Sequence, residues 1–261
     1  MRHPLFQTTK YLILDMDGTV CLGQRMLPGA GEFVQSLRAR GIGRLFFSNN
    51  SSRSVDQCVR ALRAMGFPAA PEDIAISTHV AADYLNERHP GARVFLLGNE
   101  HLSAELRQLG LRLVSDKPDL ILLGFDTTLD YEKITKAANW LAAGLPYYAT
   151  HPDVNCPVAG GFLPDTGAMI ELFAASAGRR PVVLGKPERP TVDYLCRRLA
   201  CAPQELCFVG DRLETDIAIG RHGVATALVF TGVTSPAQYE AQGECRAGLA
   251  VESLAALSGY L

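Results

Sequence analysis

The stretch "YLILDMDGTV", residues 11–20, decides the fold, because four apolar or aromatic residues run directly into two carboxylates, Asp15 and Asp17. An apolar run of this length that ends in turn residues is typical of a buried strand. Two carboxylates one residue apart repel each other, and burial of either one needs a cationic partner. The stretch alone leaves three interpretations open: the pair binds a metal, takes part in a reaction, or caps a turn.

Similar apolar runs recur along the chain, each followed by turn residues and then by a helical pattern. They are "RLFF" (44–47), "VFLL" (94–97), "LILLGF" (120–125), "PVVL" (181–184), "LCFV" (206–209) and "ALVF" (227–230). Helical patterns include "PGAGEFVQSLRARG" (28–41) and "RPTVDYLCRRLAC" (189–201). Strands that alternate with helices predict an α/β fold with a mainly parallel sheet.

The bulk properties narrow the class of protein. The chain has 261 residues, 48% hydrophobic content and a net charge of −2, with no long block of one sign. These values argue against a nucleic-acid or membrane partner and leave a small, anionic ligand open. Residues 1–10 are too short and polar for a signal peptide, and no apolar run approaches 18 residues. We therefore expect a cytoplasmic protein.

The length allows one large domain or two moderate ones. Two candidate boundaries stand out, the polar stretch 77–79 and the segment "AGRRP" (177–181), where a helical pattern ends and a strand pattern begins. If both are boundaries, residues 80–180 form an insertion. Residues 1–79 and 181–261 then join into one discontinuous domain.

Reactive side chains follow four of the apolar runs. The residues at these strand ends are Asp15 and Asp17, then Ser48, Asn49 and Asn50, then Lys186, and finally Asp211 with Asp216 beyond it. In an open parallel sheet, ligands bind outside the carboxyl ends of the strands. Four strands of one sheet would therefore bring all these groups to one place.

This collection of groups suits phosphate chemistry. Several carboxylates beside one lysine need a cation, and oxygen ligands favour Mg²⁺. A phosphate could then accept hydrogen bonds from Ser48 and from backbone amides near it, such as that of Asn49, with Lys186 adding positive charge. One carboxylate could attack phosphorus, while Asp17 would serve first as an acid and then as a base.

Four motifs in this order resemble the haloacid dehalogenase superfamily of phosphatases, which has a Rossmann-like α/β core. They are "DMDGTV" (15–20), "FFSNN" (46–50), "GKP" (185–187) and "GDRLETD" (210–216). The resemblance implies the following roles: Asp15 as nucleophile, Asp17 as acid and base, Ser48 and Lys186 as phosphate contacts, Asp15, Asp211 and the Asp17 carbonyl as Mg²⁺ ligands, and Asp216 as outer support for those ligands.

Further stretches resemble the branch of NagD-like, phosphoglycolate and pyridoxal-phosphate phosphatases. They are "DMDGTVCLG" (15–23), "SNNSSRS" (48–54), "LDYEKITKA" (129–137) and "YYATHPD" (147–153). In that branch an α/β cap domain is inserted between the second and third motifs, which agrees with the insertion 80–180. Pairing into a homodimer through the cap is a further implication. The chain has Ser48 where threonine is common, Cys21 where tyrosine is common, and His151 where asparagine is frequent.

The segment 150–169 is rich in proline and glycine and leads into a helical pattern from Thr166. It either descends from the cap to select the leaving group, as in the branch, or forms an ordinary exposed connection. On the first interpretation His151, Asp153 and Asn155 are candidate substrate contacts.

The leading hypothesis is a Mg²⁺-dependent phosphatase that acts on a small phosphorylated metabolite. A metal-dependent glycosyltransferase, a non-catalytic phosphometabolite-binding protein and, within the superfamily, a phosphomutase or phosphonate hydrolase are the alternatives. Nucleotide monophosphates, phosphoglycolate, pyridoxal phosphate and sugar phosphates all stay open as substrates, and so does the oligomeric state.

Overall fold

The computed structural model describes residues 3–158, 160–241, 243 and 245–261. The chain divides into two compact units. The first unit consists of Met1–Ser48, Val55–Ala75 and Val192–Leu261, and the second consists of Asn49–Ser54 and Ile76–Thr191. Each unit is therefore built from segments that are distant in sequence. The domain bounds expected from the sequence, 1–79 with 181–261 and 80–180, stay a prediction.

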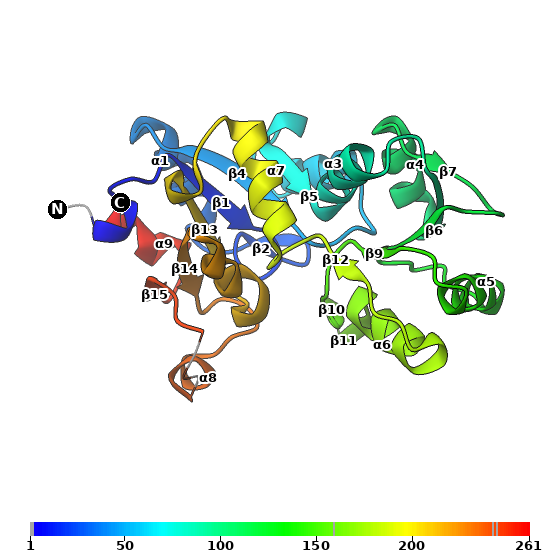
Figure 1. The fold of residues 1–261 in the computed structure, drawn as a ribbon. Helices are drawn as coiled ribbons and strands as arrows, with labels where there is room; N and C mark the ends of the chain where they lie inside the picture. The colour runs from blue at the N-terminus through cyan, green and yellow to red at the C-terminus, as the bar shows by residue number, and fades with distance from the viewer. Residues whose placement is uncertain (1–2, 159, 242, 244) are drawn as a thin grey trace. The chain divides into compact units, whose positions relative to one another are not determined.

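The first unit contains a six-stranded sheet with the order β15-β14-β13-β1-β4-β5 (Figure 1). The pairs β15–β14, β14–β13, β13–β1 and β1–β4 are parallel. The strands are β1 (Tyr11–Asp15), β4 (Gly43–Ser48), β5 (Ile74–Ile76), β13 (Leu206–Gly210), β14 (Ala225–Val229) and β15 (Leu249–Val251). The hairpin strands are β2 (Cys21–Leu22) and β3 (Arg25–Met26), and the helices are α1 (Ala30–Ala39), α2 (Val55–Ala64), α8 (Pro236–Ala241), α9 (Leu254–Leu257) and most of α7 (Arg189–Leu199).

The strand β1 lies at the centre of this sheet, and its apolar run explains that place. Leu12, Ile13 and Leu14 are fully buried, as expected for a parallel strand that is covered on both faces. Helix α1 buries Phe33 and Leu37, which lie four residues apart on one face. The predicted α/β fold with a parallel sheet is confirmed.

The second unit contains a five-stranded sheet with the order β12-β9-β8-β6-β7, in which every pair of neighbours is parallel. Its strands are β6 (Arg93–Leu97), β7 (Arg112–Leu113), β8 (Leu120–Leu123), β9 (Tyr147–Ala149) and β12 (Val182–Val183). Its helices are α3 (Ser77–Arg88), α4 (Glu100–Gln108), α5 (Tyr131–Ala142) and α6 (Thr166–Ala177). Helices α5 and α6 share a buried cluster with one face of the sheet, in which Phe95, Ile121 and Phe173 take part.

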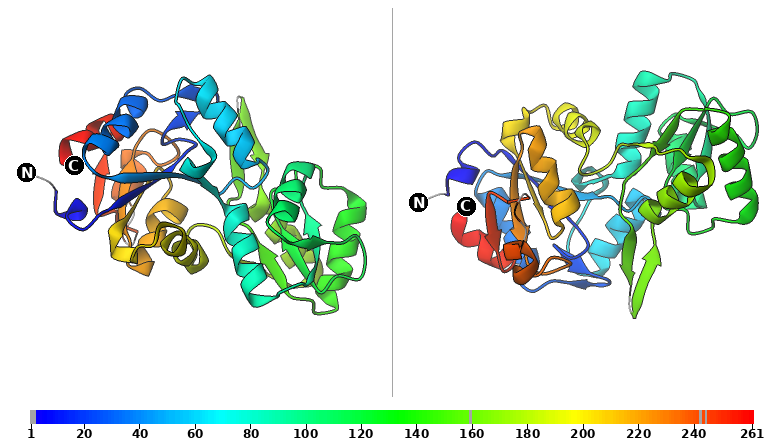
Figure 2. Two further views of the ribbon diagram at one scale, coloured as in Figure 1. Left: turned by 90° about the horizontal axis from the view of Figure 1, so that it is seen from above. Right: turned by 60° about the horizontal axis from the view of Figure 1, so that its bottom comes forward.

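The segment 150–169 is more regular than its composition suggested. It holds an antiparallel hairpin of β10 (Asn155–Val158) and β11 (Gly161–Pro164), which stands apart from the five-stranded sheet (Figure 2). Helix α6 begins at Thr166, as the helical pattern predicted, and the Asp165 side chain accepts the Thr166 N–H at its start.

One strand assignment needs correction. The sequence led us to place the run before Lys186 in the same sheet as β1, β4 and β13, but β12 pairs with β9 in the second unit. The strand is only two residues long and lies at a sheet edge, where Val182 is half exposed. Both sheets are parallel and both accept short apolar strands, so the local sequence does not distinguish between them.

No helix in the described part of the chain combines the length and the apolar character needed to cross a bilayer.

Candidate functional site

Strand pairing in the first unit brings Asp15, Ser48 and Asp211 to one edge of its sheet. Asp15 is the last residue of β1 and pairs with Phe47 of β4, so Ser48 lies one residue beyond that pair. On the other side of β1, strand β13 ends in the same register, and Asp211 follows its last residue. Because the strands are parallel, their carboxyl ends meet at this edge.

Three carboxylates gather at this edge. One oxygen atom each from Asp15, Asp211 and Asp216 lies within 4.8 Å of the other two, and both Asp211 and Asp216 are buried. Carboxylates this close destabilise one another's charge unless a cation lies among them. Three oxygen donors and no sulfur or imidazole ligand fit a hard cation such as Mg²⁺. Among the described residues, this group does not include the Asp17 side chain.

The carboxylate of Asp211 is held in a tight space. The Val233 N–H donates to Asp211 Oδ2 at 2.7 Å, and the Thr19 hydroxyl lies 3.5 Å from Oδ1. A Cβ atom on either Gly18 or Gly232 would overlap this carboxylate. The two glycines therefore leave the space that the Asp211 side chain needs.

Sequence reasoning missed the segment 231–234 in this role. It follows β14, the parallel neighbour of β13, and its Thr234 N–H also donates to the Asp211 carbonyl oxygen at 3.2 Å. The signal was present in the sequence, because "TGVT" follows the apolar run "ALVF" in the same way that the recognised motifs follow theirs.

Asp216 lies close to Asp15 and Asp211, whereas the family resemblance implied only that it supports the metal ligands from outside. It lies on a short π-helical turn, Leu213–Ile217, where its Oδ2 accepts the Arg212 N–H at 3.1 Å. A side chain on Gly210 would collide with it. Asp216 thus places an oxygen atom beside those of Asp15 and Asp211 and also supports the turn.

We expect Gly18→Ala to lower both stability and turnover. Gly18 has a φ of +94°, and an added Cβ would lie 2.5 Å from Asp211 Oδ2, which forces the carboxylate to move. The backbone strain should cost about 2 kcal/mol in the free energy of unfolding. The displaced carboxylate should lower kcat/KM about 100-fold, the effect expected of a shift near 1 Å. Urea unfolding measures the first quantity, and phosphate release, the activity expected from the motifs, measures the second.

The matched control for this variant is Gly23→Ala. Gly23 also has a positive φ, +61°, but no heavy atom lies within 4 Å of a Cβ built there. It should share the stability loss and keep its turnover. Equal kcat/KM values for the two variants would contradict the proposed contact with Asp211.

Lys186 belongs to the second unit, where its backbone is paired with the side chain of Asn49. The Lys186 N–H donates to Asn49 Oδ1 at 3.0 Å, and Asn49 Nδ2 donates to the Lys186 carbonyl oxygen at 3.0 Å. Both residues are buried. Asn49 was expected to contact phosphate, but its amide group is engaged with Lys186. The roles of Ser48, Asn49 and Lys186 toward phosphate stay predictions.

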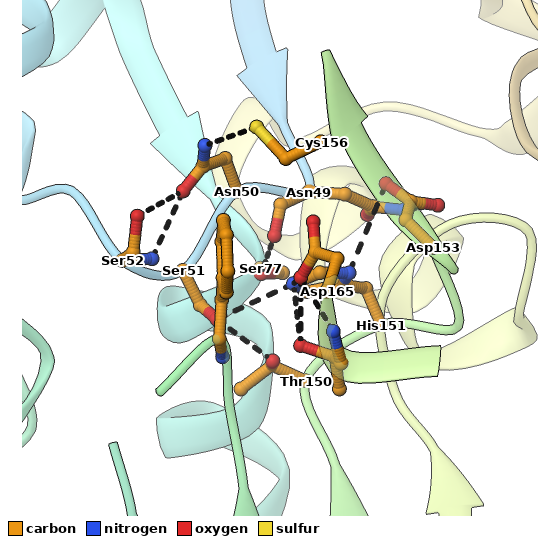
Figure 3. Close-up of polar contacts among 12 residues, drawn as sticks. Asn49, Asn50, Ser51, Ser52, Ser77, Thr150, His151, Asp153, Cys156 and Asp165 are labelled. Carbon is orange, nitrogen blue, oxygen red and sulfur yellow. Dashed lines mark hydrogen bonds and ion pairs between the residues drawn. The ribbon is translucent and has the colours of Figure 1, made fainter. Parts of the chain in front are cut away.

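His151 lies at the centre of a buried polar cluster (Figure 3). Its Nε2 is 3.1 Å from Thr166 Oγ1, 3.4 Å from Ser51 Oγ and 3.6 Å from Asp165 Oδ1, while its Nδ1 is 3.7 Å from Asp153 Oδ2. The side chain has no exposed surface. Its surroundings therefore give no support to the predicted substrate contact, and they make His151 a link between two carboxylates.

The neighbours of His151 differ in environment. Burial raises the pKa of the Asp165 carboxyl group, and the nearby His151 acts in the opposite direction. Asp153 keeps a small exposed fraction, and Asn155 is exposed at the start of β10. A substrate contact for Asp153 and Asn155 stays a prediction.

Replacing His151 by leucine should destabilise the protein by about 3 kcal/mol, because it removes a polar partner from the buried Asp165 carboxylate and from Asp153 and puts an apolar side chain among polar groups. His151→Asn should lose less, since an amide keeps donor and acceptor atoms in the cluster. Chemical denaturation measures both values. His101→Leu is the control, because His101 is exposed on α4 and its loss should stay within about 0.5 kcal/mol. Equal losses for His151→Leu and His101→Leu would disprove the assignment.

Two family models match the chain. Residues 12–112 match a haloacid dehalogenase-like hydrolase, and residues 183–257 match a HAD-hydrolase-like model. An acid sugar phosphatase from Staphylococcus aureus (strain MRSA252) is 35% identical over 228 residues, which are 87% of this chain and 88% of that protein. The match thus spans both of the units described above.

Solved structures agree with these matches. A crystal structure of a 4-nitrophenylphosphatase from Thermotoga maritima has a TM-score of 0.94 and 36% identity, covering 98% of this chain and 99% of that one. A glycerol phosphate phosphatase from Mycobacterium tuberculosis, in complex with magnesium, has a TM-score of 0.90 and 32% identity, covering 99% of this chain and 79% of that one. The motifs, the parallel core and these relatives agree: the chain belongs to the haloacid dehalogenase-like hydrolases and is a NagD-like phosphatase.

Proposed function

We propose that this phosphatase hydrolyses small phosphate monoesters with bound Mg²⁺ and through an aspartyl-phosphate intermediate. The observation that carries the proposal is the group of three carboxylates, Asp15, Asp211 and Asp216, whose oxygen atoms lie within 4.8 Å of one another at the end of β1. A glycosyltransferase needs no nucleophilic carboxylate, and a binding protein needs neither a nucleophile nor an acid. The phosphatase relatives favour hydrolysis over both alternatives.

Asp15, Asp211 and Asp216, together with the carbonyl group of Asp17, would hold the cation. When bound, Mg²⁺ would offset the carboxylate charges and draw negative charge from the phosphoryl oxygens. Phosphate monoesters hydrolyse extremely slowly without a catalyst, with enzymatic accelerations of up to about 10²¹-fold. A preorganised set of charges can stabilise the transition state and so contribute to an acceleration of this size.

The proposed chemistry has two steps. An oxygen of Asp15 forms a bond to phosphorus while the bond from phosphorus to the ester oxygen breaks, and the leaving alkoxide takes a proton from the Asp17 carboxyl group. Water then attacks phosphorus and gives a proton to the Asp17 carboxylate, and the bond between Asp15 and phosphorus breaks to release inorganic phosphate. Asp17 lies two residues beyond the nucleophile, in a turn where the Met16 carbonyl accepts two N–H groups at 3.0 Å.

Ser48 and Lys186 complete the proposal as phosphate contacts. Ser48 ends β4 beside Asp15 and is largely buried, so its hydroxyl could donate to a phosphoryl oxygen. The Lys186 ammonium would supply a positive charge that offsets the negative charge of the phosphoryl oxygens. The insertion expected at residues 80–180 would serve as the cap domain, whose role is to exclude water from the ester.

The substrate class that we propose is a small ester with a polyol or sugar leaving group, since two of the relatives are named an acid sugar phosphatase and a glycerol phosphate phosphatase. Phosphoglycolate, pyridoxal phosphate and nucleotide monophosphates are the alternatives. The cytoplasmic location and a homodimer stay predictions.

A panel of these esters, assayed for phosphate release with and without Mg²⁺, tests the proposal. We expect kcat/KM to be highest for a sugar phosphate or glycerol phosphate and turnover to require the cation. Failure to release phosphate from any ester in Mg²⁺, under conditions where a control phosphatase is active, would contradict the proposed activity. A preference for nucleotide monophosphates would contradict the substrate class alone.

A further inference from the structure

The sheet of the second unit has the reversal of strand order at which open α/β sheets have a crevice. In the order β12-β9-β8-β6-β7, the chain leaves β6 toward β7 on one side and leaves β8 toward β9 on the other. Ligands of open α/β sheets bind at such a reversal, outside the carboxyl ends of the strands. Here those ends are Gly98 and Asn99 after β6, and Gly124 and Phe125 after β8.

The chain's own segment 49–54 occupies this crevice. Ser51 Oγ accepts the Phe125 N–H at 2.9 Å, and Asn99 Nδ2 donates to the Ser52 carbonyl oxygen at 3.0 Å. Both strand ends of the reversal therefore hold the segment. A Cβ on Gly124 would overlap Leu102 Cδ2 and lie 3.2 Å from Ser51 Oγ, so glycine at this position leaves room for both side chains.

Ser51 is anchored on a third side as well. Its hydroxyl is 2.9 Å from Thr150 Oγ1 and 3.4 Å from His151 Nε2, and Figure 3 shows Ser51 and Thr150 directed toward each other. The residue is fully buried. A single hydroxyl thus ties the segment to the end of β8 and to the residues that follow β9.

Asn49 connects the anchored segment 49–54 to Lys186. Its amide makes both of the backbone hydrogen bonds to Lys186 described above, and its Nδ2 also lies 3.3 Å from Asp153 Oδ1. The Ser77 hydroxyl donates to the Asn49 carbonyl oxygen at 2.5 Å. A Cβ on Gly185, the residue before Lys186, would overlap the Thr150 carbonyl oxygen and lie 2.8 Å from Asn49 Oδ1. Glycine at this position therefore leaves room for both the Thr150 backbone and the Asn49 amide.

We infer that Asn49 and Ser51 are positioning residues, which act on the reaction through Lys186 and do not touch the phosphate with their side chains. Ser51 seats the segment in the crevice, and Asn49 aligns the Lys186 backbone with it. The inference rests on the proposed role of Lys186 as a phosphate contact. It assigns the amide of Asn49 a different task from the direct phosphate contact expected from the sequence.

Inhibition by inorganic phosphate tests the inference, because product and substrate share the phosphoryl contacts. We expect Lys186→Met to raise Ki for phosphate about 100-fold, the loss typical of a removed buried charge partner. Asn49→Ala and Ser51→Ala should each raise Ki and KM about tenfold, with kcat changed much less. The matched control is Ser52→Ala, whose hydroxyl contacts only the Asn50 side chain among the bonds described, and which should keep wild-type values.

A double-mutant cycle separates action through Lys186 from direct contact. Adding Asn49→Ala to Lys186→Met should leave Ki at the value of Lys186→Met alone, because the amide would no longer have a charge to position. Additive effects would overturn the inference and favour direct contact. If Asn49→Ala does not fold, Ser51→Ala, which removes a single oxygen atom, still tests the inference. Unchanged Ki and KM in Ser51→Ala would also overturn the inference. If Lys186→Met itself leaves Ki unchanged, the proposed function of Lys186 fails first.

Discussion

Asp15→Asn should reduce phosphate release by about 10⁴-fold or more, which is the scale of loss when a catalytic nucleophile is removed. Asparagine matches aspartate in shape but has no anionic oxygen to attack phosphorus. The variant should therefore fold normally and fail in the first chemical step. Steady-state phosphate release from a generic aryl phosphate measures the loss, and circular dichroism checks the fold.

The control for this variant is Asp56→Asn, which makes the same change on the exposed face of α2, outside the carboxylate group. It should keep wild-type turnover. Acid-quenched wild-type enzyme should also carry a phosphoryl group by intact-protein mass, whereas Asp15→Asn should not. Wild-type turnover in Asp15→Asn would refute the covalent mechanism, and a phosphorylated Asp15→Asn protein would move the intermediate to another residue.

Removal of divalent cations should have the second largest effect and should abolish turnover, with recovery on addition of Mg²⁺. Asp211→Asn should raise the Mg²⁺ concentration for half-maximal activity about 100-fold, since even the loss of support for a metal ligand costs 10–100-fold. Asn can still accept the Val233 N–H that holds the side chain, so the fold should survive. Activity titrated against Mg²⁺, together with direct calorimetric binding of Mg²⁺, measures the shift.

Asp216→Asn distinguishes the two roles open to Asp216. If Asp216 gives an oxygen atom to the cation, its loss should shift the Mg²⁺ titration in the same direction as Asp211→Asn. If it only supports the turn by accepting the Arg212 N–H, which an asparagine oxygen can also accept, the variant should keep its stability and leave the titration nearly unchanged. Full activity of the wild-type enzyme in a chelator would contradict the metal requirement itself.

The local sequence predicted the first unit well because its signals are local. A strand buried on both faces must be apolar, as Leu12, Ile13 and Leu14 are, and the residues after it must be able to turn. Parallel strands place their carboxyl ends at one edge, so the approach of Asp15 and Asp211 followed from the order of motifs. The roles of these residues came from the family resemblance, since spacing alone left binding, reaction and capping open.

Other features depended on contacts between distant parts of the chain. The two-residue strand β12 could join either sheet, and pairing with β9 decided which one. A substrate contact for His151 stays a prediction, and the structure surrounds its side chain with the nearby Asp153 and with Ser51 and Asp165 from other segments. No local pattern records that enclosure, because burial of a polar side chain depends on what the rest of the chain brings to it.

The sequence by itself determined the alternation of strands and helices and the residues that stand at the strand ends. Periodicity and turn chemistry are properties of neighbouring residues, and they act before the chain is compact. Only the tertiary structure decided that Gly232 leaves room for Asp211, and that the segment 49–54 fills the crevice of the second sheet and pairs with Lys186. Those contacts join residues far apart in the chain, and their geometry is fixed by the packing of whole elements against one another.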